Sequence, residues 1–373
     1  MKFVVALDSF KESMSALSAC NSTKEGILSV DASSNVDVVP LADGGEGTLR
    51  TLVDALNGNI ITTTVTSLLN NPIEIELGIC DDLGIIECAT MCGLELLTDD
   101  QKNPYNTTTY GLGEAILFLV NQGCKKLLIC LGGSATNDGG IGMLNALGVN
   151  FLDENNETVK LTASGLKDIV HIDNHLNPKL QDVEIIGVCD VLNPLCGKNG
   201  ATYIYGPQKG LKEKDLELID QAMLQYGTLS DHLLNSKNID TPSTGAAGGL
   251  GYAIKAYLNG NLKPGFKVVA EVTHLEDRIK DTDIVFVGEG KIDQQTQFGK
   301  TPYGVLQIAK KYHKPTIALA GKVEDEDVLK SLGFNAIYCI SDSTKPLSYN
   351  LENANNNIKN CIINHLKEMI YDL

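Results

Sequence analysis

Carboxylates and lysines recur in this sequence inside short glycine-containing stretches, each of which follows an apolar run. The stretches are Asp8-Ser9-Phe10-Lys11, Asp43-Gly44-Gly45-Glu46, Gly288-Glu289-Gly290-Lys291-Ile292-Asp293 and Ala320-Gly321-Lys322. Proteins hold Mg²⁺ with one or two carboxylates together with phosphate oxygens and water, and a lysine supplies a point charge for phosphoryl oxygens. The combination therefore indicates a magnesium nucleotide and phosphoryl transfer. Any single carboxylate could instead be a turn residue or a helix N-cap.

The most glycine-rich stretch is residues 131–140, LGGSATNDGG, which follows the apolar run 127–130 and precedes the apolar residues 141–147. This pattern predicts a strand, a turn and a helix. Backbone N–H groups at such a turn have no partner within the helix, and an anion such as phosphate suits them. Glycines that only permit a tight turn are the alternative, and the stretch alone does not decide between the two.

The charge balance restricts how an anion could be bound. The chain carries a net charge of −17, which argues against nucleic acid as a partner because phosphate backbones need clustered lysine and arginine. Arg50 and Arg278 are the only arginines in the sequence. Phosphate binding must therefore depend on backbone N–H groups, a few lysines and a divalent cation held by carboxylates.

Two common nucleotide motifs are absent. Phe298-Gly299-Lys300-Thr301 resembles the end of a P-loop, but the first glycine of that motif would fall at Gln294. Residues 131–140 contain no lysine, and neither they nor residues 245–251 have dinucleotide-fold spacing. Nucleotide binding of either of these types is therefore excluded.

The two ends of the chain alternate between strand and helix patterns, which is typical of a parallel sheet. The expected elements are strand 2–7, helix 13–28 with Ser13 as N-cap, strand 36–39, strand 284–287, loop 288–299, helix 302–311, strand 315–319, helix 325–331, strand 336–340 and helix 350–369. The middle begins with short alternating runs at 60–65, 73–79 and 85–88, which indicate antiparallel or mixed strands.

We therefore predict an α/β protein of two domains. A doubly wound parallel sheet is expected from residues 1–66 plus 283–373, and an inserted mixed α/β domain from residues 67–282. Ligands of open α/β sheets lie beyond the carboxyl ends of the strands, so we expect the active site in a cleft between the domains. The early polar residues and the lack of a long apolar run predict a cytoplasmic protein with no membrane contact.

Several motifs together resemble bacterial glycerate kinases of the first type, in the same order and over the whole length. They are Asp8-Ser9-Phe10-Lys11, Pro40-Leu41-Ala42-Asp43-Gly44-Gly45-Glu46-Gly47-Thr48, residues 132–140, Gly206-Pro207-Gln208-Lys209-Gly210, residues 245–251, and Gly288-Glu289-Gly290 with Asp293-x-Gln295-Thr296-x-x-Gly299-Lys300. Two departures are Glu12, where glycine is usual, and Lys291, where arginine is common.

This resemblance implies ATP- and Mg²⁺-dependent phosphorylation of D-glycerate to 2-phosphoglycerate, with 3-phosphoglycerate as the alternative product. It also implies a flavodoxin-like domain that carries an inserted domain similar to restriction endonucleases. The sequence is also compatible with a homodimer of this protein. Two other functions remain open: a kinase for another small hydroxy acid or sugar, and a non-catalytic protein that binds a sugar acid.

On this reading Asp190 is the expected base, and Lys11 and Lys300 offset the charge of the ATP phosphates. The expected Mg²⁺ ligands are Asp43, Glu289 and Asp293. The remaining substrate- and phosphate-binding residues are expected to be Asp8, Ser9, Gly44, Gly45, Gly132, Gly133, Ser134, Thr136, Asn137, Asp138, Gly248, Gly249, Gly288 and Thr296.

Overall fold

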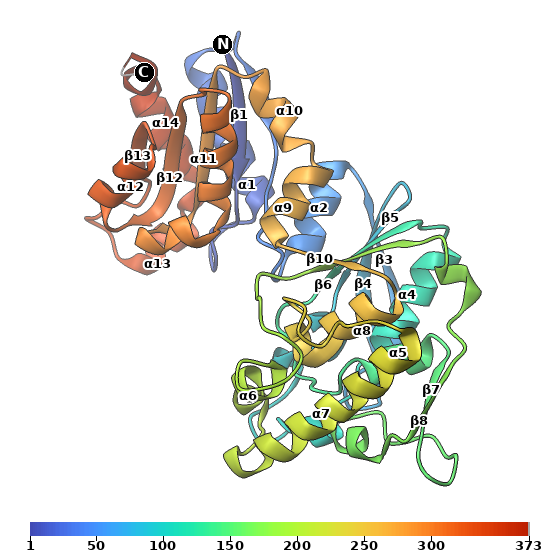
Figure 1. Ribbon diagram of the computed structural model, residues 1–373. Helices are drawn as coiled ribbons and strands as arrows, with labels where there is room; N and C mark the ends of the chain where they lie inside the picture. Colours follow the sequence, from blue (N-terminus) through green and yellow to red (C-terminus); the bar gives the residue numbers. More distant parts are fainter. Residues whose placement is uncertain (372–373) are drawn as a thin grey trace. The chain divides into compact units, whose positions relative to one another are not determined.

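A computed structural model describes residues 1–371, and the chain divides into two compact units. The first, here called the terminal unit, comprises Met1–Asp43, Arg50–Asn57 and Phe266–Leu373. The second, the middle unit, comprises Gly44–Leu49 and Gly58–Gly265. Figure 1 colours the chain by sequence, so that the blue and red ends both fall in the terminal unit.

A parallel five-stranded sheet forms the centre of the terminal unit, in the order β13-β12-β11-β1-β2. Its buried strands are rich in β-branched and aromatic residues, which fit a pleated surface covered on both faces. Counted within this unit the order is 2-1-3-4-5, so the strand order reverses between β1 and β11. The strands are β1 (Lys2–Leu7), β2 (Asn35–Val38), β11 (Ile284–Ile292), β12 (Thr316–Val323) and β13 (Ala336–Cys339).

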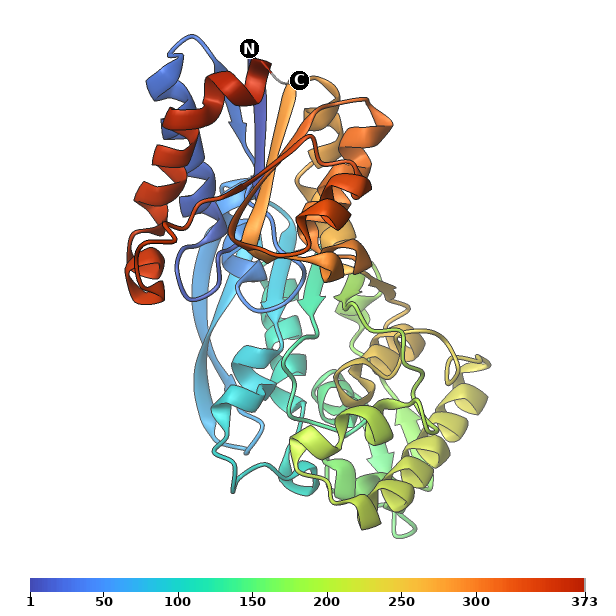
Figure 2. The same cartoon turned by 90° about the vertical axis from the view of Figure 1, so that its left-hand side faces the viewer.

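Helices cover both faces of this sheet. Figure 2 shows α1 (Ala16–Val30) and α14 (Ala354–Tyr371) together on one face and α11 (Thr301–Lys311) on the other. Apolar residues of α1 and α14 form one core with the sheet, in which Ile27, Phe286 and Ile358 are completely buried. Ser15, rather than the expected Ser13, caps α1, because its hydroxyl accepts the N–H of Ser18. The other helices of this region are α2 (Thr48–Leu56), α9 (Gly265–Val272), α10 (Leu275–Lys280), α12 (Glu326–Leu332) and α13 (Leu347–Glu352).

The middle unit contains a mixed six-stranded sheet in the order β10-β9-β6-β5-β4-β3. The pairs β3–β4 and β4–β5 are antiparallel, whereas β5, β6, β9 and β10 run parallel to one another. The carboxyl ends of these four parallel strands therefore meet at one edge. The strands are β3 (Asn59–Thr66), β4 (Pro72–Cys80), β5 (Leu83–Glu87), β6 (Lys126–Cys130), β9 (Glu184–Val188) and β10 (Asn261–Lys263), and β7 (Val149–Leu152) pairs with β8 (His171–Asn174) in a separate ribbon.

The core of the middle unit lies between this sheet and its helices. Phe151 and Tyr252 each pack edge-on against the ring of Tyr226, which lies on the long helix α7 (Glu213–Leu234). All three rings are completely buried, so they contribute much of the apolar area removed from water. The remaining helices are α3 (Ala89–Cys92), α4 (Tyr110–Asn121), α5 (Ile141–Ala146), α6 (Ala201–Tyr205) and α8 (Leu250–Tyr257).

These two sheets confirm the α/β class. The bounds of the two units and of several elements differ from those expected from the sequence. Residues 58–66 belong to the middle unit because β3 pairs with β4, and residues 266–282 belong to the terminal unit. The expected loop 288–299 is partly strand, since β11 continues to Ile292 by pairing with β12. The expected C-terminal helix is two helices, α13 and α14.

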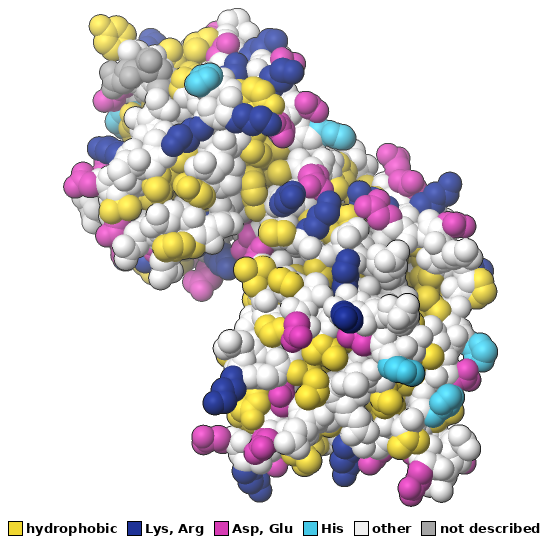
Figure 3. Space-filling model, in the orientation of Figure 1, with side chains coloured by type: hydrophobic (Ala, Val, Ile, Leu, Met, Phe, Trp, Pro, Cys, Tyr) yellow, Lys and Arg dark blue, Asp and Glu magenta, His cyan; other side chains and the backbone are white. Residues whose placement is uncertain are grey.

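The surface is mixed in charge. Figure 3 shows acidic and basic side chains interspersed over the face that it draws. No helix within residues 1–371 combines the length and apolar character that crossing a membrane requires.

Candidate functional site

The carboxyl edge of the five-stranded sheet gathers acidic side chains at the point where the strand order reverses. β1 ends directly before Asp8, whose N–H donates to the carbonyl oxygen of Gly288 in β11 (2.9 Å). Glu289 is the next residue of β11, and Asp43 follows β2. Neighbouring parallel strands thus bring together three carboxylates that are far apart in sequence. Ligands of open α/β sheets bind at such a reversal point.

Asp8 is held by its surroundings. Its carboxylate accepts hydrogen bonds from the hydroxyl of Thr301 (2.6 Å) and the N–H of Ser9 (2.6 Å). Burial raises the pKa of Asp8 from 3.8 to about 6 in spite of these bonds, and the negative charge of Asp43 adds to the rise. Thr301 is the first residue of α11, so the start of that helix fixes the orientation of Asp8.

Glu289 has a similar environment. Burial raises its pKa from 4.5 to about 7, although the ammonium of Lys300 lies 3.3 Å from its Oε1 and opposes the rise. The charges of Asp8 and Asp43 act in the same direction as burial. A lysine and three mutually repelling acids therefore share this edge, which favours a bound proton or a further cation.

The oxygen donors at this edge suit Mg²⁺, which uses one or two carboxylates and takes its other ligands from phosphate and water. Within residues 1–371, no three His, Cys, Asp or Glu side chains converge as a ready-made metal site. Carboxylate oxygens of this edge would therefore supply only part of the coordination shell of such an ion.

Asp293 was expected to bind Mg²⁺ and Thr296 to bind substrate or phosphate, and the structure gives both side chains local structural roles. Asp293 begins the short turn η7 (Gln294–Phe298), where its Oδ1 accepts the N–H of Gln295 (2.9 Å). Thr296 completes this capping box by accepting the N–H of Asp293 (3.2 Å), and Lys291 lies 3.1 Å from Asp293 Oδ2. The box satisfies N–H groups that the turn leaves free.

The polar stretch after β1 lies beside this edge. Lys11 is exposed, and its backbone approaches Gly290, where a Cβ would lie 3.4 Å from the Lys11 nitrogen. Glu12 has a φ of 63°, a left-handed conformation that favours glycine. Glycine, which is usual at this position in the family that the sequence resembles, would avoid the backbone strain that Glu12 carries.

The carboxyl edge of the middle sheet carries the glycine-rich loops. Gly132 and Gly133 follow β6 and are exposed, and a Cβ on Gly132 would lie 3.7 Å from the Cα of Gly45. Gly44 has a φ of 89°, and a Cβ there would lie 2.8 Å from the Cα of Gly265. Only glycine permits backbones to approach this closely in that conformation.

Asp190 follows β9 at the same edge. It is exposed, and its Oδ1 accepts the N–H of Gly265, the first residue of α9, at 3.0 Å. This bond satisfies an N–H that the helix cannot bond internally and holds the carboxylate next to the glycine loops.

The rest of the loop 131–140 lies inside the protein. Thr136, Asn137 and Asp138 are completely buried. The carboxylate of Asp138 accepts the N–H and the hydroxyl of Thr109 (2.9 and 2.8 Å) and the N–H of Gly140 (3.0 Å). Burial nevertheless raises the pKa of Asp138. These contacts make Asp138 the internal support of the loop.

Gly248 and Gly249 support the same loop from a second segment. Their φ angles are 68° and 96°, and the carbonyl of Gly248 accepts the N–H of Gly139 (2.9 Å). A Cβ on Gly248 would lie 2.7 Å from the Cα of Asn137 and closer still to the Thr136 carbonyl oxygen. Both glycines therefore allow two backbones to pack together.

Lys209 is a residue whose place beside the glycine-rich loop the sequence pattern did not indicate. Its side chain is buried under the glycine-rich loop, where Nζ donates to Ser134 Oγ (3.0 Å) and to the carbonyl oxygen of Thr136 (2.7 Å). The motif around Lys209 was visible in the sequence, but its burial was not.

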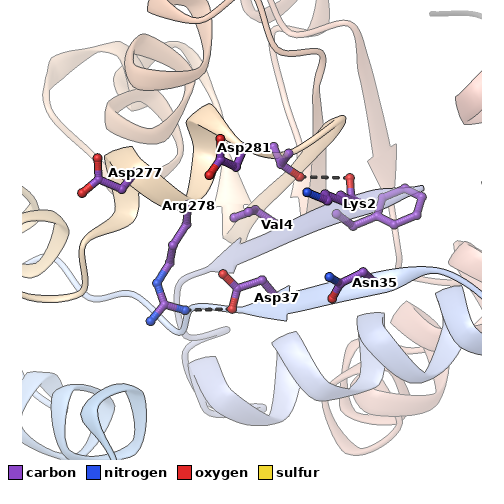
Figure 4. Close-up of a pocket in the computed structure, with 9 residues that line it drawn as sticks. Lys2, Val4, Asn35, Asp37, Asp277, Arg278 and Asp281 are labelled. Atoms are coloured by element: carbon purple, nitrogen blue, oxygen red, sulfur yellow. Dashed lines mark hydrogen bonds and ion pairs between the residues drawn. The ribbon is translucent and has the colours of Figure 1, made fainter.

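A separate pocket of about 360 Å³ lies at the amino ends of β1 and β2, beside α10. Figure 4 shows that Arg278 extends from α10 to Asp37 on β2. The distance between Arg278 Nη1 and Asp37 Oδ1 is 2.8 Å. Because the strands are parallel, this pocket is at the opposite edge of the sheet from Asp8.

Comparisons with known proteins agree with these observations. Residues 3–369 match the model of the glycerate kinase family. A relative named glycerate kinase from Bacillus subtilis (strain 168) is 41% identical over 358 residues, which cover 95% of this chain and 94% of that protein. A relative named glycerate 2-kinase from Escherichia coli (strain K12) is 39% identical over 362 residues, with 96% and 95% covered.

The fold has a solved counterpart. The crystal structure of a protein described as glycerate kinase 2 from Salmonella typhimurium LT2 has a TM-score of 0.92 and 37% sequence identity, and the match covers 100% of this chain and 98% of that one. These matches confirm the resemblance found in the sequence. The chain therefore belongs to the glycerate kinase family, whose members are ATP-dependent phosphotransferases.

Proposed function

We propose that the protein transfers the γ-phosphoryl group of ATP to D-glycerate and forms 2-phosphoglycerate and ADP. The observation that carries the proposal is the cluster of Asp8, Glu289 and Lys300 at the reversal point of a parallel sheet, in a chain that matches the family over its full length. The 2-1-3-4-5 strand order supports a flavodoxin-like terminal unit, and we propose a restriction-endonuclease-like fold for the middle unit.

In this proposal Lys11 and Lys300 offset the charge of the phosphates. Glu289 and Asp43 are the preferred Mg²⁺ ligands, because their charges act together with that of Asp8 at the carboxyl edge of the sheet, whereas Asp293 caps the turn η7. A bound Mg²⁺ would supply charge neutralisation at the phosphate oxygens. The backbone N–H groups of the glycine loops would bind a substrate oxyanion.

Asp190 remains the proposed base for the substrate hydroxyl proton. Asp190→Asn should lower kcat far more than it raises KM, and near-normal turnover would remove it from this role. Asp8 is the second candidate, because a carboxyl with a pKa of about 6 is well suited to accept a proton near neutral pH.

The reaction is tested with a panel of small hydroxy acids. Protein, Mg-ATP and each acid are mixed, ADP release is followed, and the position of the new phosphate is read by NMR. We expect D-glycerate to give the highest kcat/KM and the phosphate to be on the 2-hydroxyl. Phosphate on the 3-hydroxyl would correct the product, and another preferred acid would correct the substrate. ADP release that no acid stimulates would contradict the proposal. The cleft site and the homodimer stay predictions.

A further inference from the structure

Lys209 is a buried cation that the proposed reaction does not yet use. It ends the short 3₁₀ turn η5 (Pro207–Lys209), which follows α6 after Gly206, and 2% of the residue's surface is exposed. Its two hydrogen bonds both go to the glycine-rich loop, to Ser134 and to the carbonyl of Thr136. An ammonium has three N–H bonds, and within residues 1–371 these are its only two acceptors.

This ammonium is not neutralised by a local ion pair. Within the described residues, no carboxylate oxygen lies within 4.0 Å of Lys209 Nζ. Asp138 is the charged group whose field it feels, but that carboxylate is bonded to Thr109 and Gly140. A buried cation without a close counter-ion costs free energy, and an apolar side chain of similar size would serve packing alone better.

The acceptors of Lys209 lead directly to the exposed part of the loop. Ser134 follows Gly132 and Gly133, which lie at the carboxyl edge of the middle sheet and are exposed. Lys209 therefore places a positive charge behind a glycine turn and fixes the backbone on which that turn depends. A fixed positive charge in a region of low dielectric attracts an anion more strongly than the same charge in water.

A second observation concerns the same segment. Thr136 Oγ1 and Asn137 Oδ1 are buried, and neither has a hydrogen-bond partner within the described residues. Buried polar atoms are nearly always paired, so unpaired ones need a reason other than stability. The segment thus combines an unneutralised cation with unpaired polar atoms at one sheet edge, which is typical of a site shaped for a ligand.

We propose that Lys209 is a positioning residue that holds Ser134 and the Thr136 carbonyl so that the turn Gly132–Gly133 binds an oxyanion of a substrate. The shared chemistry is that of a carboxylate or a phosphate, so the source is the glycerate carboxylate or a phosphate of ATP. The inference rests on the proposed function and assigns a role to a residue outside it.

The titration of Lys209 gives a readout that packing would not. Burial lowers its pKa from 10.5 to about 8, partly opposed by Cys88, Asp138 and Cys92. These are the titratable groups that face it. KM for the substrate that the turn binds should rise as the pH increases above 8, and this rise should be absent in a variant without the ammonium.

The experiment compares Lys209→Met with Lys209→Arg, and uses Lys160→Met as the matched control. Lys160 is an exposed lysine of the middle unit whose Nζ also has two acceptors, Tyr105 O and Asn106 Oδ1. KM for glycerate and for ATP are measured separately with kcat and the urea midpoint, and calorimetry measures binding of glycerate and of ADP. We expect Lys209→Met to raise KM and Kd for one of the two substrates at least 10-fold, with the midpoint not lowered. Lys209→Arg should recover part of the loss, and Lys160→Met should change nothing.

A rise confined to glycerate assigns the turn to the carboxylate, and one confined to ATP and ADP assigns it to a phosphate. A folded Lys209→Met variant with both KM values and both affinities unchanged would overturn the inference.

If Lys209→Met does not fold, Ser134→Ala decides between the outcomes, because it removes one acceptor of the ammonium and keeps the charge. A 3- to 10-fold rise in KM for either glycerate or ATP supports the inference, and two unchanged KM values overturn it. A wild-type protein that binds glycerate and ADP but releases no ADP from ATP contradicts the proposed function alone, since the binding arm still tests Lys209.

Discussion

The carboxyl edges of the two sheets both carry glycines, small polar residues and carboxylates, but they use them differently. At the five-stranded sheet, burial and like charges raise the pKa of Asp8 and Glu289. At the six-stranded sheet, Asp138 is completely buried and bonded to neighbouring N–H and hydroxyl groups. Similar local sequence thus gives partly exposed acids beside further carboxylates in one unit and a completely buried acid that supports a loop in the other. Residual exposure and neighbouring charges, rather than residue type, distinguish the two edges, because Asp8 and Glu289 are only partly buried and repel each other whereas Asp138 is 0% exposed.

The largest expected effect follows from removing a carboxylate of the five-stranded edge. Glu289→Gln should lower kcat roughly 10³-fold, because under the proposed function it removes a Mg²⁺ ligand together with the ion-pair partner of Lys300. The urea midpoint should not fall, since the ionised Glu289 is destabilised by burial. Steady-state ADP release and urea unfolding measure both quantities.

The control for that variant is Glu276→Gln. Glu276 lies on α10 and forms an ion pair with Lys311 on α11, with 47% of its side chain exposed. It should keep kcat within about twofold, because an exposed ion pair contributes little. Near-wild-type kcat in Glu289→Gln would remove Glu289 from the reaction.

A pair of glycine substitutions compares the two edges directly. Gly248→Ala should destabilise the protein by about 3 kcal/mol, because it combines a positive φ with a clash against the backbone of Thr136 and Asn137. Gly299→Ala should cost only about 1–2 kcal/mol, since its φ is 103° but a Cβ would have no neighbour within 4 Å. Urea unfolding of both variants measures the difference. Equal costs would contradict the view that the middle loop is the more tightly packed.

The pH dependence of stability tests the acidic cluster. The folded pKa values of Asp8 and Glu289, about 6 and 7, lie above their ordinary values of 3.8 and 4.5. The folded state therefore holds more protons than the unfolded state between about pH 4 and 7, so this contribution to stability is complete below pH 4 and is lost as the pH rises through 7.

Replacing both acids by their amides should reduce the loss of stability across this window by on the order of 2 kcal/mol after allowance for solvent screening. Urea midpoints from pH 4.5 to 7.5, without nucleotide or metal, measure the slope. A double variant with the same slope as the wild type would show that these carboxyls have ordinary pKa values.

The smallest expected effect is at the turn after β1. Glu12→Gly should stabilise the protein by about 0.5 kcal/mol, because relief of the left-handed strain exceeds the entropy that glycine adds to the unfolded chain. Urea unfolding of this variant checks the sign. A loss of stability would mean that the side chain of Glu12 makes a contact worth more than the strain.

Part of this molecule could be predicted from the sequence. The apolar run ending at Leu7 predicts both β1 and the location of Asp8. A run of apolar residues marks where a buried strand ends, and the first polar residue after it lies at the edge of the sheet. The extension of β11 through Glu289 could not be predicted, since its glycines and charges resemble a loop. Only pairing with β12, a distant segment, makes it a strand.

The roles of two loop residues also depended on tertiary structure. Asp138 has the sequence surroundings of a ligand-binding residue, but its contact with Thr109 comes from a segment 29 residues away. Lys209 is 75 residues from Ser134, so its burial beneath the loop follows from the packing of η5 and not from local sequence.

A side-by-side single-turnover measurement tests whether the reaction depends on the carboxylate of Glu289 and not on that of Asp138. Phosphoryl transfer from ATP to glycerate is timed in Glu289→Gln and in Asp138→Asn, with each rate divided by the folded fraction. We predict a loss of at least about 100-fold for Glu289→Gln, and a rate within about threefold of wild type for Asp138→Asn in spite of a lower urea midpoint. A normal rate in Glu289→Gln together with a large loss in folded Asp138→Asn would contradict the assignment.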